Sequence, residues 1–371
     1  MRVLHGYSGN LFGGIETMLV SLAQLKECYP QTKHEFALCF KGRLQQELEQ
    51  AGAVVHSLGE VRFRQPWTVW RARRRLAHVL EVCPFDVVVC HACWPHALLA
   101  PVVRQAGIPL VFWAHDAIHK PTWVTRWASW TAPQLVIANS RYTAGTLTAL
   151  FPQTRTELLA YPIPNTQLPH AETIRTQVRT EMQVPDDCTV LIQVSRMEAW
   201  KGHKLLLDAL SLSNTTSAWQ CWIVGGPQRA EEQRYQQALQ RQVQAARLEE
   251  RVRFLGQRSD VPRLLAAADV HCQPNLGPEP FGITFIEALY AGLPVVTTAM
   301  GGALEIVTPD CGLLVPPEDT IALAKKLTYL IDHPAECRRL GAAGPARAAA
   351  LCNPQAIAPQ LHSLLTSLVV A

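Results

Sequence analysis

Several features that would point to other protein classes are missing from this sequence of 371 residues. No apolar run approaches the roughly eighteen residues that a helix needs to span a bilayer, and the chain enters a predicted strand directly at Arg2–His5. The net charge is only +4 and there is no acidic or basic tail, so the overall balance calls for no nucleic-acid partner. No low-complexity tract or internal repeat is apparent. We therefore expect a soluble, cytoplasmic protein that does not bind nucleic acid.

Clustered cysteines are also missing, although the chain contains 11 of them. Their number is odd and they are spread among predicted strands and helices, as expected for small core residues in a reducing compartment. Cys90 and Cys93 have the spacing of half a zinc site or of a redox pair, but no second pair at metal-ligand spacing accompanies them. Core packing is the favoured interpretation, and no metal site is predicted.

Short apolar runs alternate with longer segments of helical periodicity, which predicts parallel sheets covered by helices. At about 150 residues per domain, the length predicts two domains. The proline-rich stretch Tyr161–Asn165 marks their junction, so we expect domains at 1–163 and 164–352. A helix at 353–371 either returns to the first domain or closes the second. The predicted strands are Arg2–His5, Glu35–Phe40, Val54–Ser57, Val87–Cys90, Leu110–Trp113, Leu135–Ala138, Thr189–Val194, Gln220–Val224, Arg253–Leu255, Val270–Gln273, Val295–Thr297 and Gly312–Val315.

The most informative motif surrounds Glu279. A proline-broken loop at 278–282 leads into a predicted helix that starts at Ile283 and contains Glu287. The free amides at a helix start, together with the positive end of the helix dipole, form an anion site that suits a diphosphate. Glu279 can accept hydrogen bonds from sugar hydroxyls and Glu287 can hold a ribose, so the motif predicts a nucleotide-sugar site. The alternative is a surface helix with incidental acidic residues.

This glutamate pair, with the downstream segments Gly292–Val296 and Gly301–Glu305, resembles the signature of the family 4 retaining glycosyltransferases, which have the GT-B fold. The resemblance covers nearly the whole chain, although its sharp motifs lie in the second half. It implies an α/β protein with two Rossmann-like domains facing an interdomain cleft. The first domain would bind the acceptor and the second the nucleotide-sugar. The donor-binding residues that it implies in this segment are Phe281, Gly282, Ile283, Thr284 and Glu287.

Arg196 and Lys201 lie between a predicted strand and a helix that starts near His203. Fixed cations at a strand end can stabilise the charge that develops on a departing nucleoside diphosphate. The pair resembles the arginine and lysine with which the family binds the diphosphate in place of a metal. We therefore assign Arg196, Lys201 and Glu279 to catalysis, with incidental surface charge as the alternative.

The N-terminal half offers fewer candidates. Gly13 and Gly14 follow the first strand, and the resemblance implies that this pair lies beside the diphosphate and the acceptor. Their spacing is not Gly-x-Gly-x-x-Gly, which counts against a dinucleotide oxidoreductase. His115 ends another strand, where family members place a histidine against the transferred sugar. A structural turn and a structural histidine are the respective alternatives.

Two strand ends of the second half, at Gly225 and at Leu255 with Gly256, lie where the family binds the base and the ribose. We assign these residues to nucleotide binding on the resemblance alone, because backbone contacts leave little trace in the side chains.

Two tryptophan patterns have competing interpretations. Residues 62–75 interleave Trp67 and Trp70 with arginines, as in a basic amphipathic helix for an anionic membrane or a solvated helix face. We favour the solvated face, so contact with the inner face of a membrane is allowed but not favoured. Trp123, Trp127 and Trp130 have helical spacing, which favours core packing over a platform for stacking carbohydrate.

The sequence thus predicts a retaining, metal-independent glycosyltransferase that moves a hexose from a UDP- or GDP-sugar to an acceptor hydroxyl. No cofactor beyond the donor is expected. The resemblance allows a saccharide, a sugar phosphate, a lipid-linked glycan or a metabolite as acceptor, and no motif selects among them. A catalytically silent nucleotide-sugar-binding protein and a GT-B epimerase are the alternatives.

Overall fold

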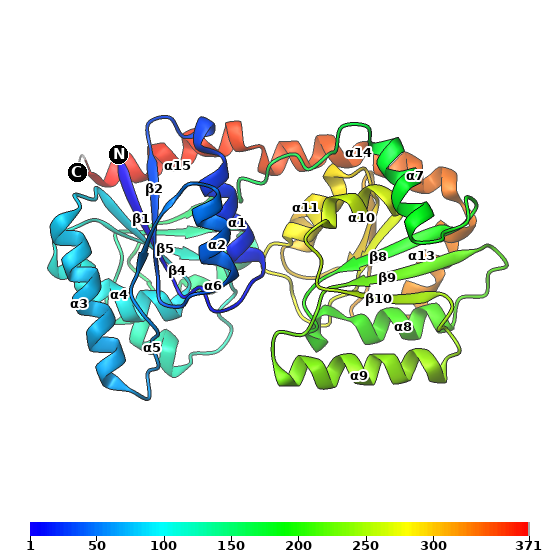
Figure 1. Ribbon diagram of the computed structural model, residues 1–371, viewed down its shortest axis with the longest axis horizontal. Helices are drawn as coiled ribbons and strands as arrows, with labels where there is room; N and C mark the ends of the chain where they lie inside the picture. Colours follow the sequence, from blue (N-terminus) through cyan, green and yellow to red (C-terminus); the bar gives the residue numbers. More distant parts are fainter. Residues whose placement is uncertain (370–371) are drawn as a thin grey trace. The chain divides into compact units, whose positions relative to one another are not determined.

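The computed structural model describes residues 1–369, which divide into two compact units. The first unit contains Met1–Pro164 and the segment from Cys352 onward, and the second contains Asn165–Leu351. The sequence predicts boundaries at 163/164 and 352/353. Each unit is a parallel sheet covered by helices (Figure 1).

The first unit is built on a sheet of seven parallel strands in the order β3-β2-β1-β4-β5-β6-β7. The central strands are continuous apolar runs because both of their faces are covered; every residue of β4 and β5 is buried. Six of the strands were expected, and the seventh, β7, is a short edge strand that no apolar run announces. The strands are β1 (Arg2–Tyr7), β2 (Lys33–Leu38), β3 (Val54–Ser57), β4 (Val87–His91), β5 (Leu110–Ala114), β6 (Leu135–Ala138) and β7 (Thr156–Leu158).

The helices of the first unit include the last helix of the chain. α15 belongs to this unit, where His362 Nδ1 lies 2.8 Å from Thr32 Oγ1 and the Ile163 amide donates to the Cys352 carbonyl over 3.1 Å. Ser140 caps α6 by accepting from the Thr143 amide at 3.0 Å. The helices are α1 (Gly14–Gln24), η1 (Lys26–Cys28), α2 (Arg43–Gln50), α3 (Pro66–Val82), α4 (Cys93–Gln105), α5 (Trp123–Ser129), α6 (Arg141–Leu147) and α15 (Pro354–Val369).

The second unit has six parallel strands in the order β10-β9-β8-β11-β12-β13, all close to their predicted positions. Asp269 directly precedes β11, which has the bounds predicted from the sequence. There it accepts hydrogen bonds from Arg175, Arg179 and the Val190 amide. The strands are β8 (Thr189–Val194), β9 (Trp219–Val224), β10 (Val252–Gly256), β11 (Val270–Gln273), β12 (Val295–Thr298) and β13 (Gly312–Val315).

Eight α-helices and one short 3-10 helix complete the described part of the second unit. They are α7 (Ala171–Glu181), η2 (Ala199–Lys201), α8 (His203–Ser211), α9 (Ala230–Ala245), α10 (Val261–Ala267), α11 (Ile283–Tyr290), α12 (Ala303–Ile306), α13 (Thr320–Asp332) and α14 (Pro334–Cys352).

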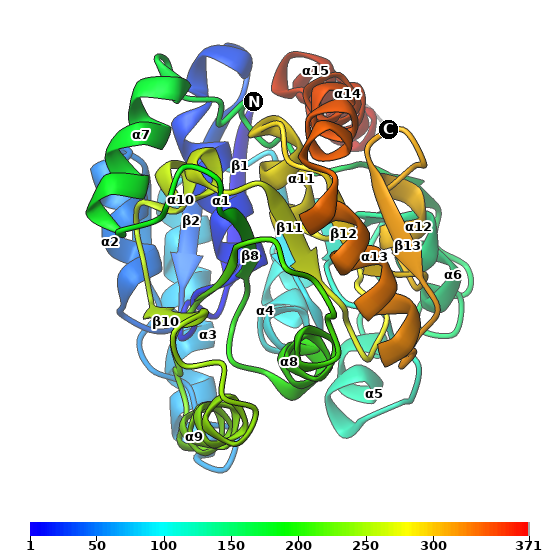
Figure 2. The same cartoon turned by 90° about the vertical axis from the view of Figure 1, so that its right-hand side faces the viewer.

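Both sheets reverse their strand order once, between β1 and β4 in the first unit and between β8 and β11 in the second. Figure 2 shows β8 beside β11. Ligands of open α/β sheets bind outside the carboxyl ends of the strands at such a reversal. A ligand site is therefore expected among the residues that follow β8 and β11.

The cysteines form no disulfide within the described residues. Cys90 is fully buried in β4, and Cys93 lies half-buried at the start of α4. Across positions 1–369, no cluster of three histidine, cysteine or acidic side chains could hold a metal ion.

Candidate active site

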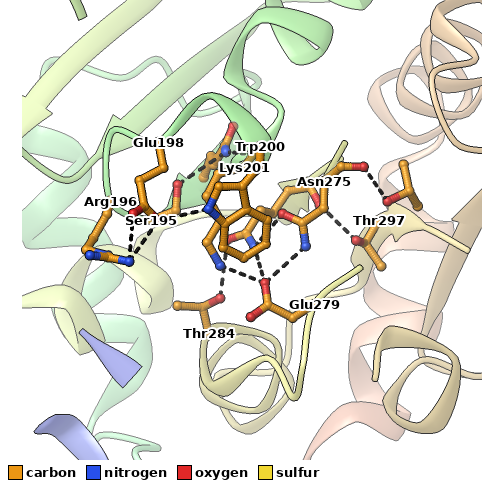
Figure 3. A network of polar contacts seen from close by, with 12 residues as sticks. Ser195, Arg196, Glu198, Trp200, Lys201, Asn275, Glu279, Thr284 and Thr297 are labelled. Atoms are coloured by element: carbon orange, nitrogen blue, oxygen red, sulfur yellow. Dashed lines mark hydrogen bonds and ion pairs between the residues drawn. The ribbon is translucent and has the colours of Figure 1, made fainter. Parts of the chain in front are cut away.

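Lys201 and Glu279 meet at the reversal point of the second sheet. Lys201 ends η2, which follows β8, and Glu279 lies in the loop that follows β11. Lys201 Nζ donates to Glu279 Oε2 over 2.7 Å, and the two side chains are only 14% and 11% exposed (Figure 3). The two catalytic candidates of these separate loops therefore form one partly buried ion pair.

Two amide side chains hold the Glu279 carboxylate in place. Gln273 Nε2 and Asn275 Nδ2 donate to the same Oε2 at 3.2 and 3.0 Å. Thr297 and Thr298, at the end of β12, fix the backbone of this loop by donating to the carbonyls of Gln273 and Asn275, each over 2.8 Å. Additional hydrogen bonds of this kind offset the desolvation that a buried ion pair suffers. The carboxylate is thus pre-positioned, with its orientation set by β11 and β12.

Arg196 belongs to the same loop as Lys201 but has a different partner. Its Nη2 donates to Glu198 over 2.8 Å, and Trp200 Nε1 donates to the same carboxylate at 3.0 Å (Figure 3). Lys201 Nζ lies 3.9 Å from the centroid of the Trp200 ring. Glu198 and Trp200, which the sequence analysis did not select, therefore position both cations.

Two glycines let the loops of this site, which follow β8, β11 and β12, approach each other closely. Gly202 has a φ of 76°, and a Cβ atom there would lie 1.8 Å from the Pro274 carbonyl oxygen. Gly301 has a φ of 59°, and its Cβ would lie 2.5 Å from the Glu279 carbonyl oxygen. Both positions require glycine on conformational and steric grounds. The contact at Gly202 brings the Lys201 loop against the Glu279 loop, and the contact at Gly301 packs the loop after β12 against Glu279.

The start of α11 lies directly after Glu279. Gly282 caps it with a φ of 108°, while Phe281 and Ile283 are buried beside it. Thr284 Oγ1 lies 3.4 Å from Gln273 Oε1, a weak contact that ties the first turn to β11. The helix start and the carboxylate thus form one structural unit, as the anion-site prediction requires.

Glu287 lies one turn further along α11. Its side chain is shielded within the second unit, and burial raises the pKa of its carboxyl group to about 7. The protonation state of a carboxyl group with a pKa near 7 responds strongly to a bound ribose, because the ribose hydroxyls donate hydrogen bonds to the ionised form. Its assignment to the ribose remains a prediction.

Gly225 and Gly256 come together at the ends of β9 and β10. The Gly225 amide donates to the Gly256 carbonyl over 2.8 Å, and a Cβ on Gly225 would lie 1.9 Å from the Ser195 carbonyl oxygen. The pairing of β10 with β9 is irregular between Phe254 and Gly256, at Leu255. These contacts bring the predicted nucleotide-binding backbone beside the loop of Arg196, although they do not test what it binds.

In the first unit, Gly13 is held by a buried glutamate that the sequence analysis missed. Glu16 Oε2 accepts from the Gly13 amide at 2.8 Å, and Glu16 Oε1 accepts from Tyr7 OH at 2.7 Å. Gly13 and Gly14 therefore begin α1 in a capping box that is tied to the end of β1. Their contact with a donor or an acceptor remains a prediction.

His115 ends a chain of four histidines that crosses the first sheet, of which His34 is half-buried and the other three are buried. His34 on β2, His5 on β1, His91 on β4 and His115 after β5 are linked in that order by nitrogen–nitrogen distances of 2.8 Å. The last ring is 2.6 Å from Tyr161 OH. Burial lowers the pKa of each ring, to about 4 for His34 and about 3 for His115.

This chain determines what His115 can do. Both of its ring nitrogens are hydrogen-bonded within the first unit, and only 3% of the residue is exposed. A contact with a donor sugar would have to replace one of those hydrogen bonds. Four neutral rings in series share one proton per link, so the tautomer of His115 is coupled to that of His34. The sugar contact remains a prediction.

The family of the chain follows from two successive matches. Residues 13–169 match the model of the glycosyl transferase 4-like domain, and residues 175–347 match that of the glycosyl transferases group 1. The chain belongs to the group 1 glycosyltransferases. The predicted resemblance to the family 4 enzymes is thereby confirmed, and its group 1 domain contains the ion pair of Lys201 and Glu279.

Curated relatives of this glycosyltransferase include proteins named as mannosyltransferases. The chain is 38% identical over 160 residues to the phosphatidyl-myo-inositol mannosyltransferase of Mycobacterium leprae, covering 42% of this chain and 40% of that protein. It is 31% identical over 202 residues to a GDP-mannose-dependent mannosyltransferase of Corynebacterium glutamicum that acts on a monoacylated phosphatidylinositol monomannoside, covering 52% and 51%. The matches thus span about half, or less, of the relatives' length.

Solved structures match over the full length. The structure of Anabaena HepE in complex with UDP and glucose has a TM-score of 0.87 and 25% identity, covering 99% of this chain and 100% of that chain. The sucrose-phosphate synthase of Thermosynechococcus elongatus has a TM-score of 0.79 and 20% identity, covering 100% and 99%, and shows the fold alone. The prediction of a GT-B fold with two Rossmann-like α/β domains is confirmed.

Proposed function

We propose that this protein transfers a hexose, with retention of configuration, from a UDP- or GDP-sugar to an acceptor hydroxyl. The observation that carries the proposal is the buried contact between Lys201 Nζ and Glu279 Oε2 beside the start of α11. This contact places the Lys201 cation for the diphosphate, the Glu279 carboxylate for the sugar hydroxyls and the start of α11 at one strand reversal. The UDP-bound and UDP-glucose-bound structures of HepE support a donor of this class.

In the proposed reaction, the acceptor oxygen bonds to the anomeric carbon as the bond from that carbon to the diphosphate breaks. The departing phosphate takes up the acceptor proton, so no protein nucleophile is required. Arg196 and Lys201 stabilise the charge that develops on the diphosphate. Glu279 holds the sugar, Glu287 holds the ribose, and the amides of α11 bind the diphosphate. The cationic role is assigned to side chains and not to a metal.

For the acceptor, we propose a lipid-linked or saccharide hydroxyl. The names of the relatives support this class, since they include mannosyltransferases of phosphatidyl-myo-inositol and of the lipopolysaccharide core. The donor base is left as uracil or guanine, because HepE binds UDP-glucose whereas the Corynebacterium glutamicum relative depends on GDP-mannose.

A thermal-shift screen against UDP, GDP, ADP and their sugar conjugates tests the proposal, because a ligand that binds only the folded state raises the melting temperature. We expect a shift with UDP or GDP, followed by acceptor-dependent release of that nucleotide. Nucleotide release with a changed sugar in the absence of any acceptor would identify an epimerase. A shift without turnover on any acceptor would favour a silent binding protein.

A further inference from the structure

A surface of exposed tryptophans lies on α3 and α5 of the first unit. Trp67 and Trp70 on α3 are 57% and 59% exposed, and Trp123 and Trp130 at the two ends of α5 are 60% and 73% exposed. The expectation that Trp123 and Trp130 pack into the core is therefore wrong. Large indole rings left in water in this way are unusual and mark an interaction site. We call these four residues the tryptophan surface.

Contacts join α5 to α3 and to the turn that precedes it. Phe63, in the turn before α3, packs against Trp123 and Trp127 of α5 with ring centroids 5.3 and 4.8 Å apart. The guanidinium of Arg73 on α3 lies 5.6 Å from the Trp127 ring. Figure 1 shows α3 and α5 near α4 at the same end of the first unit. The half-buried Trp127 and the exposed Trp123 thus pack against the same side chain, Phe63.

Arginines surround the tryptophan surface without matching acidic partners. Arg64, Arg71 and Arg126 are exposed, and none of them forms an ion pair with another described residue. Arg74 lies over the Trp70 ring at 4.9 Å, and Arg62 has only a long, solvent-exposed contact of 3.8 Å with Glu60. A pair of that kind contributes little, so most of the positive charge remains available to a partner.

A hollow of about 280 Å³ adjoins Trp67 and offers a place for one anionic group. Arg62, Arg71 and Arg75 line it, together with Glu60 and neutral residues of the preceding turn. Guanidinium groups bind phosphate through several hydrogen bonds at once, which makes this a suitable place for a phosphate headgroup.

We propose that the tryptophan surface and its arginines dock the first unit on an anionic lipid bilayer. Tryptophan is favoured at the boundary between headgroups and acyl chains, where its ring is buried and its N–H stays near water. Arginines next to such rings bind anionic headgroups. None of the helices within residues 1–369 is long and apolar enough to cross a membrane, so the docking is peripheral. The proposal does not depend on the identity of the donor.

Two observations favour a bilayer over a solvated helix face or a soluble polyanion. A solvated helix face is explained by the exposed arginines alone. It does not explain why four indole rings are exposed. A soluble polyanion would also bind to the arginines alone and would leave the four rings in water, whereas a bilayer interface takes up both the rings and the arginines. The interpretation favoured from the sequence, a solvated face of α3, is therefore replaced by membrane docking.

Vesicle flotation of the full chain tests this proposal with two kinds of vesicle, phosphatidylcholine alone and phosphatidylcholine mixed with phosphatidylglycerol. Binding should occur only with the anionic vesicles and should weaken as salt is added. The variant W67A/W70A and the variant R71E/R74E should each bind at least about tenfold more weakly. The first removes two large rings that the interface would bury, and the second removes two basic residues, each worth about 1 kcal/mol near an anionic surface. R234E/R241E on α9 removes exposed arginines of the second unit and should bind like the wild type.

The folded state of each variant is checked by its melting temperature and by its nucleotide-induced thermal shift, neither of which should change. Equal binding to both kinds of vesicle, binding to neither, or equal loss in R234E/R241E would overturn the proposal. So would binding to heparin without binding to anionic vesicles, because that result would identify a soluble polyanion as the partner. If nucleotides do not raise the melting temperature of the wild type, that result counts against the proposed function and not against the docking surface.

Discussion

Lys201 Nζ and Glu279 Oε2 are 2.7 Å apart although the two residues are separated by 78 positions in the chain. The strand reversal between β8 and β11 brings them together, and Gly202 allows the backbone next to Lys201 to touch the backbone that leads to Glu279. The candidate active site is therefore a property of the sheet topology as much as of the side chains.

Replacement of Lys201 by alanine should reduce kcat/KM by about a hundredfold to a thousandfold, the cost of losing one fixed group that stabilises developing charge. Lys204→Ala is the matched control, because Lys204 is an exposed lysine of α8 that pairs with Asp208. Steady-state kinetics with the donor found in the screen measure both variants. Near-native kcat/KM in Lys201→Ala would remove Lys201 from the mechanism.

Gly202→Ala should destabilise the second unit more than Gly107→Ala destabilises the first. Both glycines have positive φ, 76° and 70°, so alanine costs each about 1 to 2 kcal/mol in backbone strain. Only at Gly202 would the new methyl group also collide with a backbone oxygen, while nothing lies within 4 Å at Gly107. Urea denaturation gives both free energies of unfolding, and equal losses would show that the close approach of the two loops is absent.

Nucleotide-sugar binding should weaken as the pH falls through about 7, where the Glu287 carboxyl takes up a proton. The ionised carboxylate accepts hydrogen bonds from a ribose better than the protonated form does, so the ligand binds preferentially to the ionised state. A nucleotide-sugar is the right probe, since its diphosphate, unlike a terminal phosphate with a pKa of about 6, does not titrate in this range. Calorimetric titrations should show this pH dependence in the wild type and its loss in Glu287→Gln.

The buried histidines should make the protein sensitive to acid. His5, His34, His91, His115 and His271 have pKa values lowered by burial, so below the ordinary value of about 6.5 the unfolded chain binds more protons than the folded one. Their contribution to stability is complete above that pH and is lost progressively as the pH falls towards 4, at about 1.4 kcal/mol per pH unit for each neutral histidine.

Urea denaturation at a series of pH values measures this slope. His271 tests it most simply, because neither of its ring nitrogens has a hydrogen-bond partner among the described residues. His271→Leu should reduce the slope by about one proton, whereas replacement of the exposed His78 by glutamine should leave it unchanged. A slope unaffected by His271→Leu would mean that this ring is not buried in its neutral form.

The sequence was sufficient to predict the fold, because the strands of parallel sheets are continuous apolar runs that stand out from the segments between them. β7 was missed because it is a three-residue edge strand with polar residues and one exposed leucine. The role of Asp269 was not predicted because it depends on Arg175 and Arg179 of α7, a helix almost a hundred residues earlier.

The pairing of side chains from distant segments could not be predicted from the sequence. Lys201 and Glu279 were selected separately, but nothing in the spacing showed that they form one ion pair. Nor did the positions of His5 and His91 show a chain ending at His115, since that depends on which strands are neighbours and on their register. The exposure of Trp123 and Trp130 was predicted wrongly because helical spacing does not reveal which face of a helix is covered.

The most direct test of the account compares the affinities of a bare nucleotide and of its sugar conjugate by calorimetric titration, in the wild type and in Glu279→Gln. If Glu279 holds the donor sugar, the variant should bind the bare nucleotide like the wild type and lose the additional affinity that the sugar provides. If the variant retains that sugar-dependent affinity in full, Glu279 does not contact the sugar and the proposed active site is wrong.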